Sequence, residues 1–495
     1  MIMAKREPDL AVKHKGFPYQ AEALAATKDL PFAAIFHEQG LGKTKIGIDL
    51  GLTWLQSEIV DSVIIVTKRG LIQNWVDELR FHTHVEPRVI TQDRKANFLA
   101  FNSPARIYLA HYEAIRSEQR RLQIFLQTRN VGMILDEAHK IKNPDAAITH
   151  ALFSLIQFLK KRVIMTGTPV ANRPYDLWSQ VYFLDQGKSL GTNFKDFQSR
   201  LDLSNDLASD GEKARAFEQN LSEVFQKIRP FSVRETKNGA DIQLPLKRFE
   251  TISVEMESRQ AEIYEQYKRE FSWILLKHGQ PVLDDAEDSL KRLLRLVQVA
   301  SNPRLIDDSY RTVPGKLPVL QSLIDDIVDK DEKVIVWTAF TANVDWLARE
   351  FRSYGAVRIH GKMDHEQRTA SIRSFKTDAD CKVLIATPSS AKEGLTLTVA
   401  NNAVFFDRGF SLDDYLQAQD RIHRISQTKD CIVTVLQSKG TIDEWVENLL
   451  SAKSLAAQLA QGDITKSVYQ QKAEYSFGEM IKDVLGFDRK EEHAI

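Results

Sequence analysis

Ten short runs of apolar and β-branched residues, separated by helical patterns, constrain the fold of this chain more than any other feature. Half of them lie in the first third of the sequence and half lie beyond residue 330. Strands that alternate with helices favour a parallel sheet with helices on both faces and ligands at the carboxyl ends of the strands. The sequence therefore predicts an α/β fold with two such lobes. The expected strands are 32–36, 63–67, 106–110, 131–135, 163–166, 334–338, 357–360, 383–386, 404–406 and 431–436.

Residues 37–44, His-Glu-Gln-Gly-Leu-Gly-Lys-Thr, lie between the first expected strand and a stretch with helical spacing. Gly40 and Gly42 can adopt dihedrals that are closed to other residues, so successive N–H groups can point at a phosphate beside a helix N-terminus. Lys43 would hold the β and γ phosphates, and the Thr44 hydroxyl would ligate Mg²⁺. The full Walker pattern has glycine where this chain has His37, so the stretch alone also fits a loop without phosphate.

Two carboxylates, Asp136 and Glu137, close the fourth expected strand. Strand ends in such sheets are where sites form. Asp136 would hold Mg²⁺ through water, and Glu137 would orient or deprotonate the attacking water, as nucleotide hydrolysis requires. Acidic residues are also common at helix N-termini. The pair is informative because it follows the glycine-rich loop in the same lobe.

Three further sets of polar residues fit nucleotide chemistry, and each has an ordinary alternative. Gln20 could read an adenine edge, because an amide donates and accepts at once, or it could be a capping or solvated glutamine. Thr166 and Thr168 could couple the carboxylates to movement or belong to an ordinary turn. Arg421 and Arg424 would share one helix face. They could supply positive charge to the γ-phosphate from the facing lobe and so tie hydrolysis to a domain motion, or they could be solvated.

In this order, the motifs resemble a superfamily-two helicase core, and specifically its Swi/Snf-like branch of ATP-driven DNA translocases. The resemblance runs from about Phe17 to Leu450. It implies two RecA-like lobes facing across a cleft, each with a helical insertion, and duplex DNA lying across that cleft. The segments that carry the branch-level detail are 139–143, 165–172, 176–178, 315–317 and 417–427.

The resemblance also implies a role for each matching position. ATP would be bound by Gln20, Gly40, Leu41, Gly42, Lys43, Thr44 and Gln417. Catalysis would involve Lys43, Asp136, Glu137, Arg421 and Arg424, with Mg²⁺ held by Thr44 and Asp136. DNA would be contacted by Thr67, Lys68, His111, Tyr112, Thr338, Gly361, Thr396 and Thr398. The chain departs from the family's usual residues at His37, Gln39, Thr396 and Ser426 and at the pair 391–392, none of which is a catalytic group.

The remaining organisation follows from composition and segment patterns. The 67 basic and 67 acidic residues cancel, so the case for nucleic acid rests on motifs. Cys381 and Cys431 lie in strand-like runs and are expected in the core, without a disulfide framework or zinc finger. No apolar run approaches the ~18 residues that span a bilayer. We expect a soluble, cytoplasmic monomer that uses ATP and Mg²⁺ and binds double-stranded DNA; an unidentified protein partner is compatible, and a bacterial or bacteriophage source is favoured by the lack of accessory segments.

Five segments are expected: a first RecA-like ATP-binding lobe (1–170), a helical insertion with the end of lobe one (171–240), a linker with the helical insertion of lobe two (241–312), a second RecA-like helicase C-terminal lobe (313–450) and a helical, charged tail (451–495). Strands should be scarce between about residues 175 and 305, with a loop over 204–213 and a linker over 238–245.

Three functions compete: a duplex translocase that remodels DNA or protein–DNA complexes, a strand-separating DNA or RNA helicase, and a nucleotide-gated binding module. The intact catalytic set weighs against the third. The branch-level motifs favour the first, as does the expectation that Trp337, Trp346 and Trp445 lie in the core and not on a strand-separating wedge.

Overall fold

The computed structural model describes residues 8–102, 105–202, 210–237, 239–240, 244–278, 287–392, 396–424 and 426–473. The chain divides into two compact units. Unit 1 comprises Met1–Asp202, Gln219–Ile242 and Leu459–Ile464, and unit 2 comprises Leu203–Glu218, Gln243–Gln458 and Thr465–Ile495. Each unit is built on one sheet: unit 1 contains the sheet of lobe one, and unit 2 contains the sheet of lobe two.

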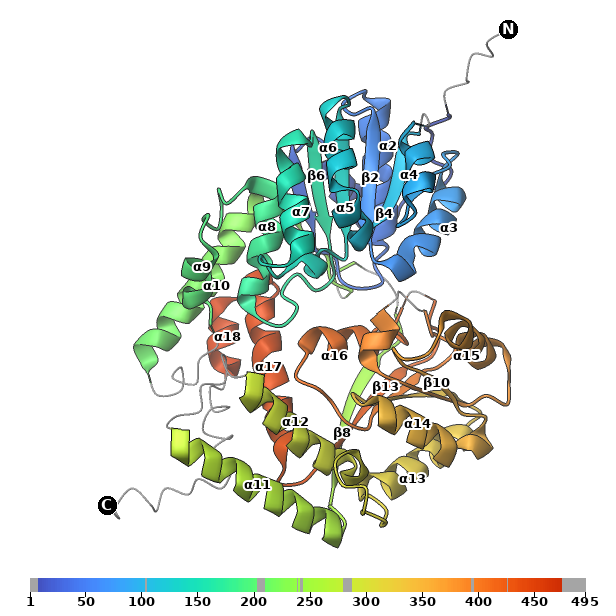
Figure 1. Ribbon diagram of the computed structural model, residues 1–495, viewed down its shortest axis with the longest axis vertical. Helices are drawn as coiled ribbons and strands as arrows, with labels where there is room; N and C mark the ends of the chain where they lie inside the picture. Colours follow the sequence, from blue (N-terminus) through green and yellow to red (C-terminus); the bar gives the residue numbers. More distant parts are fainter. Residues whose placement is uncertain are drawn as a thin grey trace. The chain divides into compact units, whose positions relative to one another are not determined.

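Lobe one contains a seven-stranded sheet of order β3-β4-β2-β5-β6-β1-β7, with all neighbours parallel (Figure 1). Residues of the central strands β2 and β5 are buried throughout, because helices cover both faces of a parallel sheet. The carboxyl ends of the strands therefore meet along one edge. The strands are β1 (Phe32–Ile35), β2 (Ser62–Thr67), β3 (Arg88–Ile90), β4 (Ile107–His111), β5 (Val131–Asp136), β6 (Lys161–Met165) and β7 (Ser232–Val233).

Lobe two contains a six-stranded parallel sheet of order β10-β11-β9-β12-β13-β8. Its strands alternate between two apolar layers: Ile335 and Trp337 of β9 pack in one core cluster, and Val334 and Val336 pack in another. This is the two-residue period of a sheet that is covered on both faces. The strands are β8 (Lys247–Val254), β9 (Val334–Trp337), β10 (Val357–Ile359), β11 (Val383–Ala386), β12 (Asn402–Phe405) and β13 (Cys431–Ser438).

The helices of the sequence between Pro18 and Ile228 are α1 (Pro18–Thr27), α2 (Lys43–Gln56), α3 (Ile72–His82), α4 (Arg94–Asn102), α5 (Tyr112–Ser117), α6 (Gln119–Gln127), α7 (Ala147–Leu155), α8 (Leu177–Asp185), α9 (Phe194–Arg200) and α10 (Gly211–Ile228). The later helices are α11 (Ser258–His278), α12 (Glu287–Ser301), α13 (Lys316–Asp329), α14 (Thr341–Glu350), α15 (His365–Thr377), α16 (Leu412–Gln419), α17 (Ile442–Gln461) and α18 (Lys466–Lys472).

The predicted α/β fold of two parallel-sheet lobes is confirmed, and every expected strand forms with bounds within two residues of the prediction. The expectation of scarce strands between 175 and 305 missed β8, which pairs along its whole length with β13. This strand, Lys-Arg-Phe-Glu-Thr-Ile-Ser-Val, is mostly exposed at the sheet edge, so it lacks the apolar signal of a buried strand.

Several smaller expectations can also be compared with the structure. Cys381 and Cys431 are buried, as are Trp337, Trp346 and Trp445, so both core predictions are confirmed. No helix among the described residues is long and apolar enough to cross a membrane. Parts of the predicted loop (204–209), linker (238 and 241–243), tail (474–495) and DNA-contacting loop (393–395) lie outside the described residues.

Candidate nucleotide site and its surroundings

The glycine-rich loop joins β1 to α2 at the carboxyl edge of the lobe-one sheet. Gly40 has φ +86° and Gly42, the N-cap of α2, has φ +65°. Both values lie in the left-handed region that glycine adopts without strain. A side chain at Gly42 would also collide with the Gln20 amide. The loop therefore requires glycine at both positions, as the phosphate-binding interpretation predicts.

Lys43 begins α2 and folds back over the loop. Its Nζ donates to the carbonyl oxygens of His37 (2.9 Å) and Glu38 (3.1 Å). Thr44 follows in the first turn of the helix and is half-buried. An ammonium group held by two carbonyls can exchange them for phosphate oxygens, with which it makes stronger, charge-assisted hydrogen bonds.

Gln20 connects α1 to the same loop. Its Oε1 accepts from the Phe17 N–H (2.9 Å), which caps α1, and its Nε2 donates to the carbonyl oxygens of Leu41 (3.2 Å) and Gly42 (3.4 Å). Gln20 therefore caps α1, as the capping alternative predicted, and its buried amide is also hydrogen-bonded to the glycine-rich loop. Its contact with adenine stays a prediction.

Asp136 is the last residue of β5, and its carboxylate is held by three donors. Oδ2 accepts from the Thr67 hydroxyl (2.9 Å) and from Trp75 Nε1 (2.8 Å), and Oδ1 accepts from the Glu137 N–H (3.0 Å). Burial, with the charge of Glu137 beside it, raises the pKa of Asp136 above its ordinary value, against these hydrogen bonds. A nearby cation would lower the pKa of Asp136 again by favouring its charged form. The environment of this carboxylate therefore suits a Mg²⁺ site.

The remaining groups fit the same ion. Mg²⁺ in nucleotide sites takes one or two protein oxygens, and waters and phosphates complete its shell. The Asp136 carboxylate and the Thr44 hydroxyl are oxygen ligands of that kind. Among the described residues, no group of three or more His, Cys, Asp and Glu side chains forms an all-protein metal cage, and Mg²⁺ at a phosphate site does not need one.

Glu137 adopts a left-handed backbone, with φ +53° and ψ +47°. This conformation costs a non-glycine residue on the order of 1–3 kcal/mol and is concentrated at functional sites. The Glu137 carboxylate lies 3.2 Å from His139 Nδ1, which is also 3.2 Å from the Thr166 hydroxyl. The strained backbone therefore aims the carboxylate toward a polar cluster at the sheet edge.

The protonation of His139 follows from its other neighbour. Lys68 Nζ lies 2.9 Å from His139 Nε2, and a lysine ammonium can only donate. Nε2 must accept, so Nδ1 carries the proton and faces Glu137 and Thr166. Lys68, His139 and Thr166 thus form one hydrogen-bonded group beside the second carboxylate. Thr166 was predicted at a strand end and Lys68 as a DNA contact, whereas the hydrogen bonds of His139 with these two residues were not predicted.

The turn after β6 brings this group close to the phosphate loop. A Cβ on Gly167 would lie 3.2 Å from Lys43 Nζ and 3.0 Å from the Gln39 nitrogen, so the backbone of this turn packs against the loop. Thr168 N–H donates to the Thr166 hydroxyl (3.1 Å). Contacts therefore run without interruption from Lys43 through the 166–168 turn and His139 to Glu137.

Four residues predicted to contact DNA are buried and bonded within their own lobes, and their contact with DNA stays a prediction. The Thr67 hydroxyl is committed to Asp136, and the Tyr112 hydroxyl donates to the Asp136 carbonyl oxygen (2.8 Å). His111 caps α5, with Nδ1 accepting from the Ala114 N–H (3.2 Å). Thr338 donates to Asp407 in lobe two (2.7 Å). The hydrogen bonds of these four side chains thus stabilise the lobe in which each side chain lies.

The other predicted DNA contacts are at least partly accessible. Lys68, Thr396 and Thr398 are half-buried, and Gly361 is exposed with open space around its Cα. The Thr396 hydroxyl accepts from Arg424 Nη1 (2.8 Å), and Thr398 shares a hydrogen bond with Ser426 (2.9 Å). DNA contact by these four residues stays a prediction.

The expected helix face for Arg421 and Arg424 is wrong. Helix α16 ends at Gln419, and both arginines lie in the turns that follow it. Arg421 is only 1% exposed, so the solvated-face alternative is also wrong for this residue. Arg424 is half-buried, and its Nε donates to the Asp420 carbonyl oxygen (3.1 Å).

Gln417, predicted to bind the nucleotide, is buried inside lobe two. Its Nε2 donates to Asp413 Oδ1 (2.7 Å), one turn earlier on α16. The Nε2 group is therefore engaged by a neighbour on its own helix, and contact of Gln417 with a nucleotide stays a prediction.

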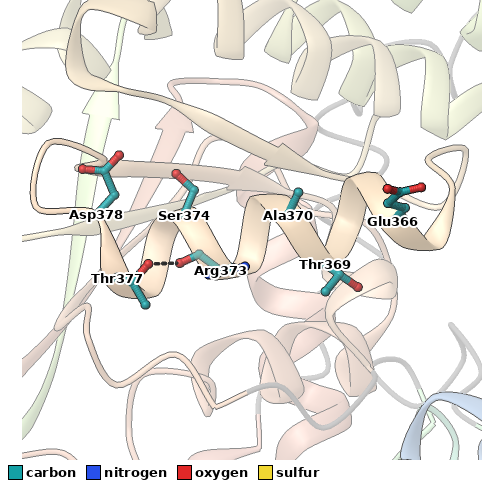
Figure 2. Close-up of a pocket in the computed structure, with 7 residues that line it drawn as sticks. All are labelled: Glu366, Thr369, Ala370, Arg373, Ser374, Thr377 and Asp378. Carbon is teal, nitrogen blue, oxygen red and sulfur yellow. Dashed lines mark hydrogen bonds between the residues drawn. The ribbon is translucent and has the colours of Figure 1, made fainter.

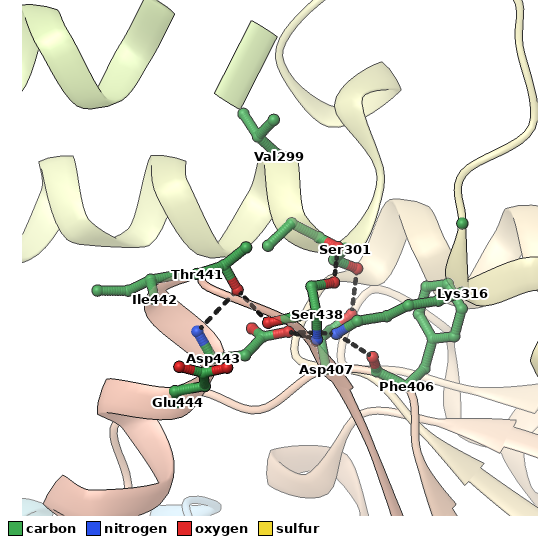
Figure 3. Close-up of polar contacts among 12 residues, drawn as sticks. Val299, Ser301, Lys316, Phe406, Asp407, Ser438, Thr441, Ile442, Asp443 and Glu444 are labelled. Carbon is green, nitrogen blue, oxygen red and sulfur yellow. Dashed lines mark hydrogen bonds and ion pairs between the residues drawn. The ribbon is translucent and has the colours of Figure 1, made fainter. Parts of the chain in front are cut away.

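A buried polar network in lobe two contains Ser301, Asp407 and Lys316 (Figure 3). Asp407, two residues after β12, accepts from the hydroxyls of Ser301 (2.6 Å) and Thr338 (2.7 Å) and from the Ala339 N–H (2.6 Å). Burial raises the pKa of Asp407. The network joins the end of α12 to the loops after β9 and β12.

Lys316 extends this network to α17. Its Nζ donates to the Phe406 carbonyl oxygen (2.9 Å) and pairs with Asp443 Oδ2 (2.6 Å), and both side chains are buried. We expect Lys316→Met to lower the free energy of unfolding by about 3–5 kcal/mol, because Asp443 is left as a buried charge without its cation. Chemical denaturation measures the effect.

The matched control is Lys439→Met. Lys439 pairs with Glu255 (3.1 Å) in the same unit, but both side chains are more than half exposed, so the loss should be within about 1 kcal/mol. Equal, small effects of the two variants would contradict a structural role for the buried pair.

A separate hollow in lobe two lies along α15 (Figure 2). Its lining comes from one helix and the residue after it, Glu366, Thr369, Ala370, Arg373, Ser374, Thr377 and Asp378. None of these is a predicted site residue, so the hollow is not a candidate for the nucleotide site.

Comparison with known proteins agrees with the two-lobe architecture. Residues 32–305 match the model of the SNF2-related domain, and residues 315–426 match the helicase conserved C-terminal domain. The chain is 25% identical over 485 residues to the ISWI chromatin-remodeling complex ATPase ISW1 of Saccharomyces cerevisiae, covering 92% of this chain and 41% of that protein. It is 26% identical over 463 residues to the DNA repair and recombination protein RAD54-like of Gallus gallus, covering 82% of this chain and 61% of that protein.

The chain thus spans less than two thirds of the length of these relatives. A solved structure, the Sulfolobus solfataricus SWI2/SNF2 ATPase core in complex with dsDNA, is 25% identical and covers 97% of this chain and 98% of that chain, with a TM-score of 0.41. The model of the SNF2-related domain alone matches more than half of the sequence. This chain therefore belongs to the SNF2-related family, as the resemblance of its motifs predicted.

Proposed function

We propose that this protein is an ATP-dependent translocase on double-stranded DNA that remodels DNA or protein–DNA complexes without separating the strands. The observation that carries the proposal is the continuous set of contacts from Lys43 to Glu137 at the carboxyl edge of the lobe-one sheet. It brings a phosphate-binding loop and a carboxylate suited to a general base to one place, which ATP hydrolysis requires.

Each lobe-one residue has a distinct task in this proposal. Lys43 exchanges the carbonyl oxygens of His37 and Glu38 for the β and γ phosphates, and the N–H groups of 40–44 surround them. Bound Mg²⁺ would neutralise phosphate charge, with Thr44 and Asp136 as its protein ligands. Glu137 accepts a proton from the attacking water, and His139 Nδ1 lies 3.2 Å from its carboxylate.

Lobe two would complete the reaction. Arg421 and Arg424 are proposed to supply positive charge to the γ-phosphate in the transition state. Both arginines are bonded to the loop that contains Thr396: the Arg421 carbonyl oxygen accepts from the Leu397 N–H (3.0 Å), and Arg424 Nη1 donates to the Thr396 hydroxyl (2.8 Å).

Support for duplex DNA comes from the family and from the aromatic residues. The relatives reported above are a chromatin-remodeling ATPase and a DNA repair and recombination protein. A strand-separating enzyme usually inserts an apolar or aromatic wedge between bases. Trp337, Trp346 and Trp445 are buried, so none of these three can serve as a wedge.

We retain the predicted five-segment division, the monomeric state and an unidentified protein partner as parts of the proposal. The reported relatives are from yeast and chicken, which gives no support to a bacterial or bacteriophage source.

ATPase rates in the presence of different nucleic acids test the proposed substrate. We expect duplex DNA to stimulate hydrolysis more than single-stranded DNA or duplex RNA does, largely independently of base sequence. Stimulation should weaken steeply as salt rises, because gripping a backbone is mainly electrostatic.

Two strand-displacement assays on the same preparation separate the translocase from the helicase. We expect displacement of a third strand from a triplex and no unwinding of a forked duplex. Efficient fork unwinding without triplex displacement would instead establish the strand-separating helicase.

A further inference from the structure

The chain after β7 runs beside the first residues of the phosphate loop. β7 pairs with β1 in parallel, with Val233 opposite Ile35. Beyond the strands, Phe36 N–H donates to the Val233 carbonyl oxygen (2.8 Å) and Glu38 N–H donates to that of Glu235 (2.9 Å). The beginning of the loop is therefore bonded to residues that follow it by almost 200 positions.

Arg234 adds a charged contact at this point. Its Nη1 donates to the Phe36 carbonyl oxygen (2.6 Å), and its Nε and Nη2 bind the two carboxylate oxygens of Asp463. Both side chains are only 17% exposed. Two-pronged pairing of guanidinium and carboxylate is the strong, geometrically specific form of this interaction, so Asp463 fixes the direction in which Arg234 points.

Asp463 belongs to a segment that packs closely on lobe one. Residues Leu459–Ile464, at and after the end of α17, belong to the same compact unit as the phosphate loop. Gly462 has φ +79°, and any side chain there would collide with the ring of Phe225. The fit leaves room for glycine alone, which indicates a defined docking site for the segment.

The contact reaches the residues that hold Lys43. Phe36 precedes His37, whose carbonyl oxygen, with that of Glu38, accepts from Lys43 Nζ. The side chain of His37 is buried, and burial together with the charge of Lys43 lowers its pKa to about 4, with a smaller contribution from Arg234. Arg234 thus binds the carbonyl oxygen of Phe36, one residue before the His37 carbonyl that Lys43 must release.

We propose that Arg234 is a positioning residue for the phosphate loop and that Asp463 holds it in place, so that docking of the segment 459–464 sets the affinity of the loop for nucleotide phosphates. The inference rests on the proposed nucleotide site. The segment consists of the last residues of α17 and the residues after them. Any process that undocks this segment from lobe one would therefore weaken nucleotide binding without altering a residue that contacts phosphate.

The test uses Asp463→Asn and Arg234→Lys in the full chain. The first change keeps the size of the Asp463 side chain and removes its charge, and the second keeps the charge of Arg234 and removes the fork. We expect each variant to bind a fluorescent ADP analogue about tenfold more weakly than the unaltered chain. Backbone amides of residues 36–40 should exchange hydrogen faster in the absence of nucleotide.

The matched control is Glu86→Gln. Glu86 pairs with Arg80 (3.4 Å) in the same unit, with both side chains more than half exposed and away from the loop. The control should change neither affinity nor exchange at residues 36–40. The double variant Arg234→Lys with Asp463→Asn should bind the analogue no more weakly than the worse single variant, because residues that act as a pair are not additive.

Three results would overturn the proposal. The first is that Asp463→Asn matches Glu86→Gln in affinity and exchange. The second is additive losses in the double variant. The third is faster exchange across the whole lobe-one sheet with a lower unfolding midpoint, which would indicate general destabilisation. If the unaltered chain binds no nucleotide, the proposed function fails, while exchange at residues 36–40 still tests the positioning role.

Discussion

Lys43→Ala is expected to lower ATP turnover by at least about 10²–10³-fold, the loss typical of removing one preorganised donor from a developing charge. The structure gives the reason in the position of the ammonium group, which lies over the loop and contacts the carbonyl oxygens of His37 and Glu38. Alanine is a strong helix former, so α2 should begin at the same place.

Steady-state ATPase rates and the unfolding midpoint are the two measurements. Lys13→Ala is the control, because Lys13 Nζ also donates to a main-chain oxygen, that of Arg80 (2.8 Å), but is exposed. Both variants should unfold like the unaltered chain. Unchanged turnover in Lys43→Ala would show that residues 37–44 are not the phosphate-binding loop.

Local patterns predicted much of the fold. The buried strands β2, β5, β9 and β11 are continuous apolar runs, because both faces of each are covered. Such runs can be read from the sequence without knowing their neighbours. The left-handed glycines at 40 and 42 are local as well, since their dihedrals are a property of the loop itself.

The elements that were missed depend on their neighbours. β8 carries Lys247, Arg248 and Glu250 on an exposed edge and is a strand because β13 lies beside it. β7 is only two residues long and pairs with β1 across some 200 positions of sequence. Neither has an intrinsic pattern that favours a strand over a loop.

The site shows the same limit at the level of side chains. The resemblance assigned Thr67 and Tyr112 to DNA, and the structure shows that both are also bonded to Asp136. Trp75 was not among the predicted site residues, yet its indole N–H donates to the same carboxylate from 61 positions away. Burial and long-range pairing decide these roles, and no local spacing encodes them.

Glu137→Gln is expected to lower ATP turnover by about 10²–10⁴-fold, the usual contribution of a general base. An amide cannot accept the proton of the attacking water at neutral pH. It keeps the shape of the side chain and an oxygen beside His139. The left-handed backbone at this position should also persist, because glutamine and glutamate present the same atoms at Cβ. Binding of ATP and of duplex DNA should therefore remain close to that of the unaltered chain.

Separate measurement of nucleotide affinity and turnover distinguishes a base from a structural residue. Glu113→Gln is the control, because Glu113 also lies near charged groups, at 3.0 Å from His111 and 3.6 Å from Lys140, but is partly exposed. The ATP turnover of this variant should change little. A parallel loss of ATP affinity and turnover in Glu137→Gln would mean that the carboxylate supports the site and does not act on water. Loss of turnover alone, with affinity retained, is the result expected if the strained backbone at Glu137 aims a proton acceptor, since the amide keeps the shape of the side chain and removes only its charge and basicity.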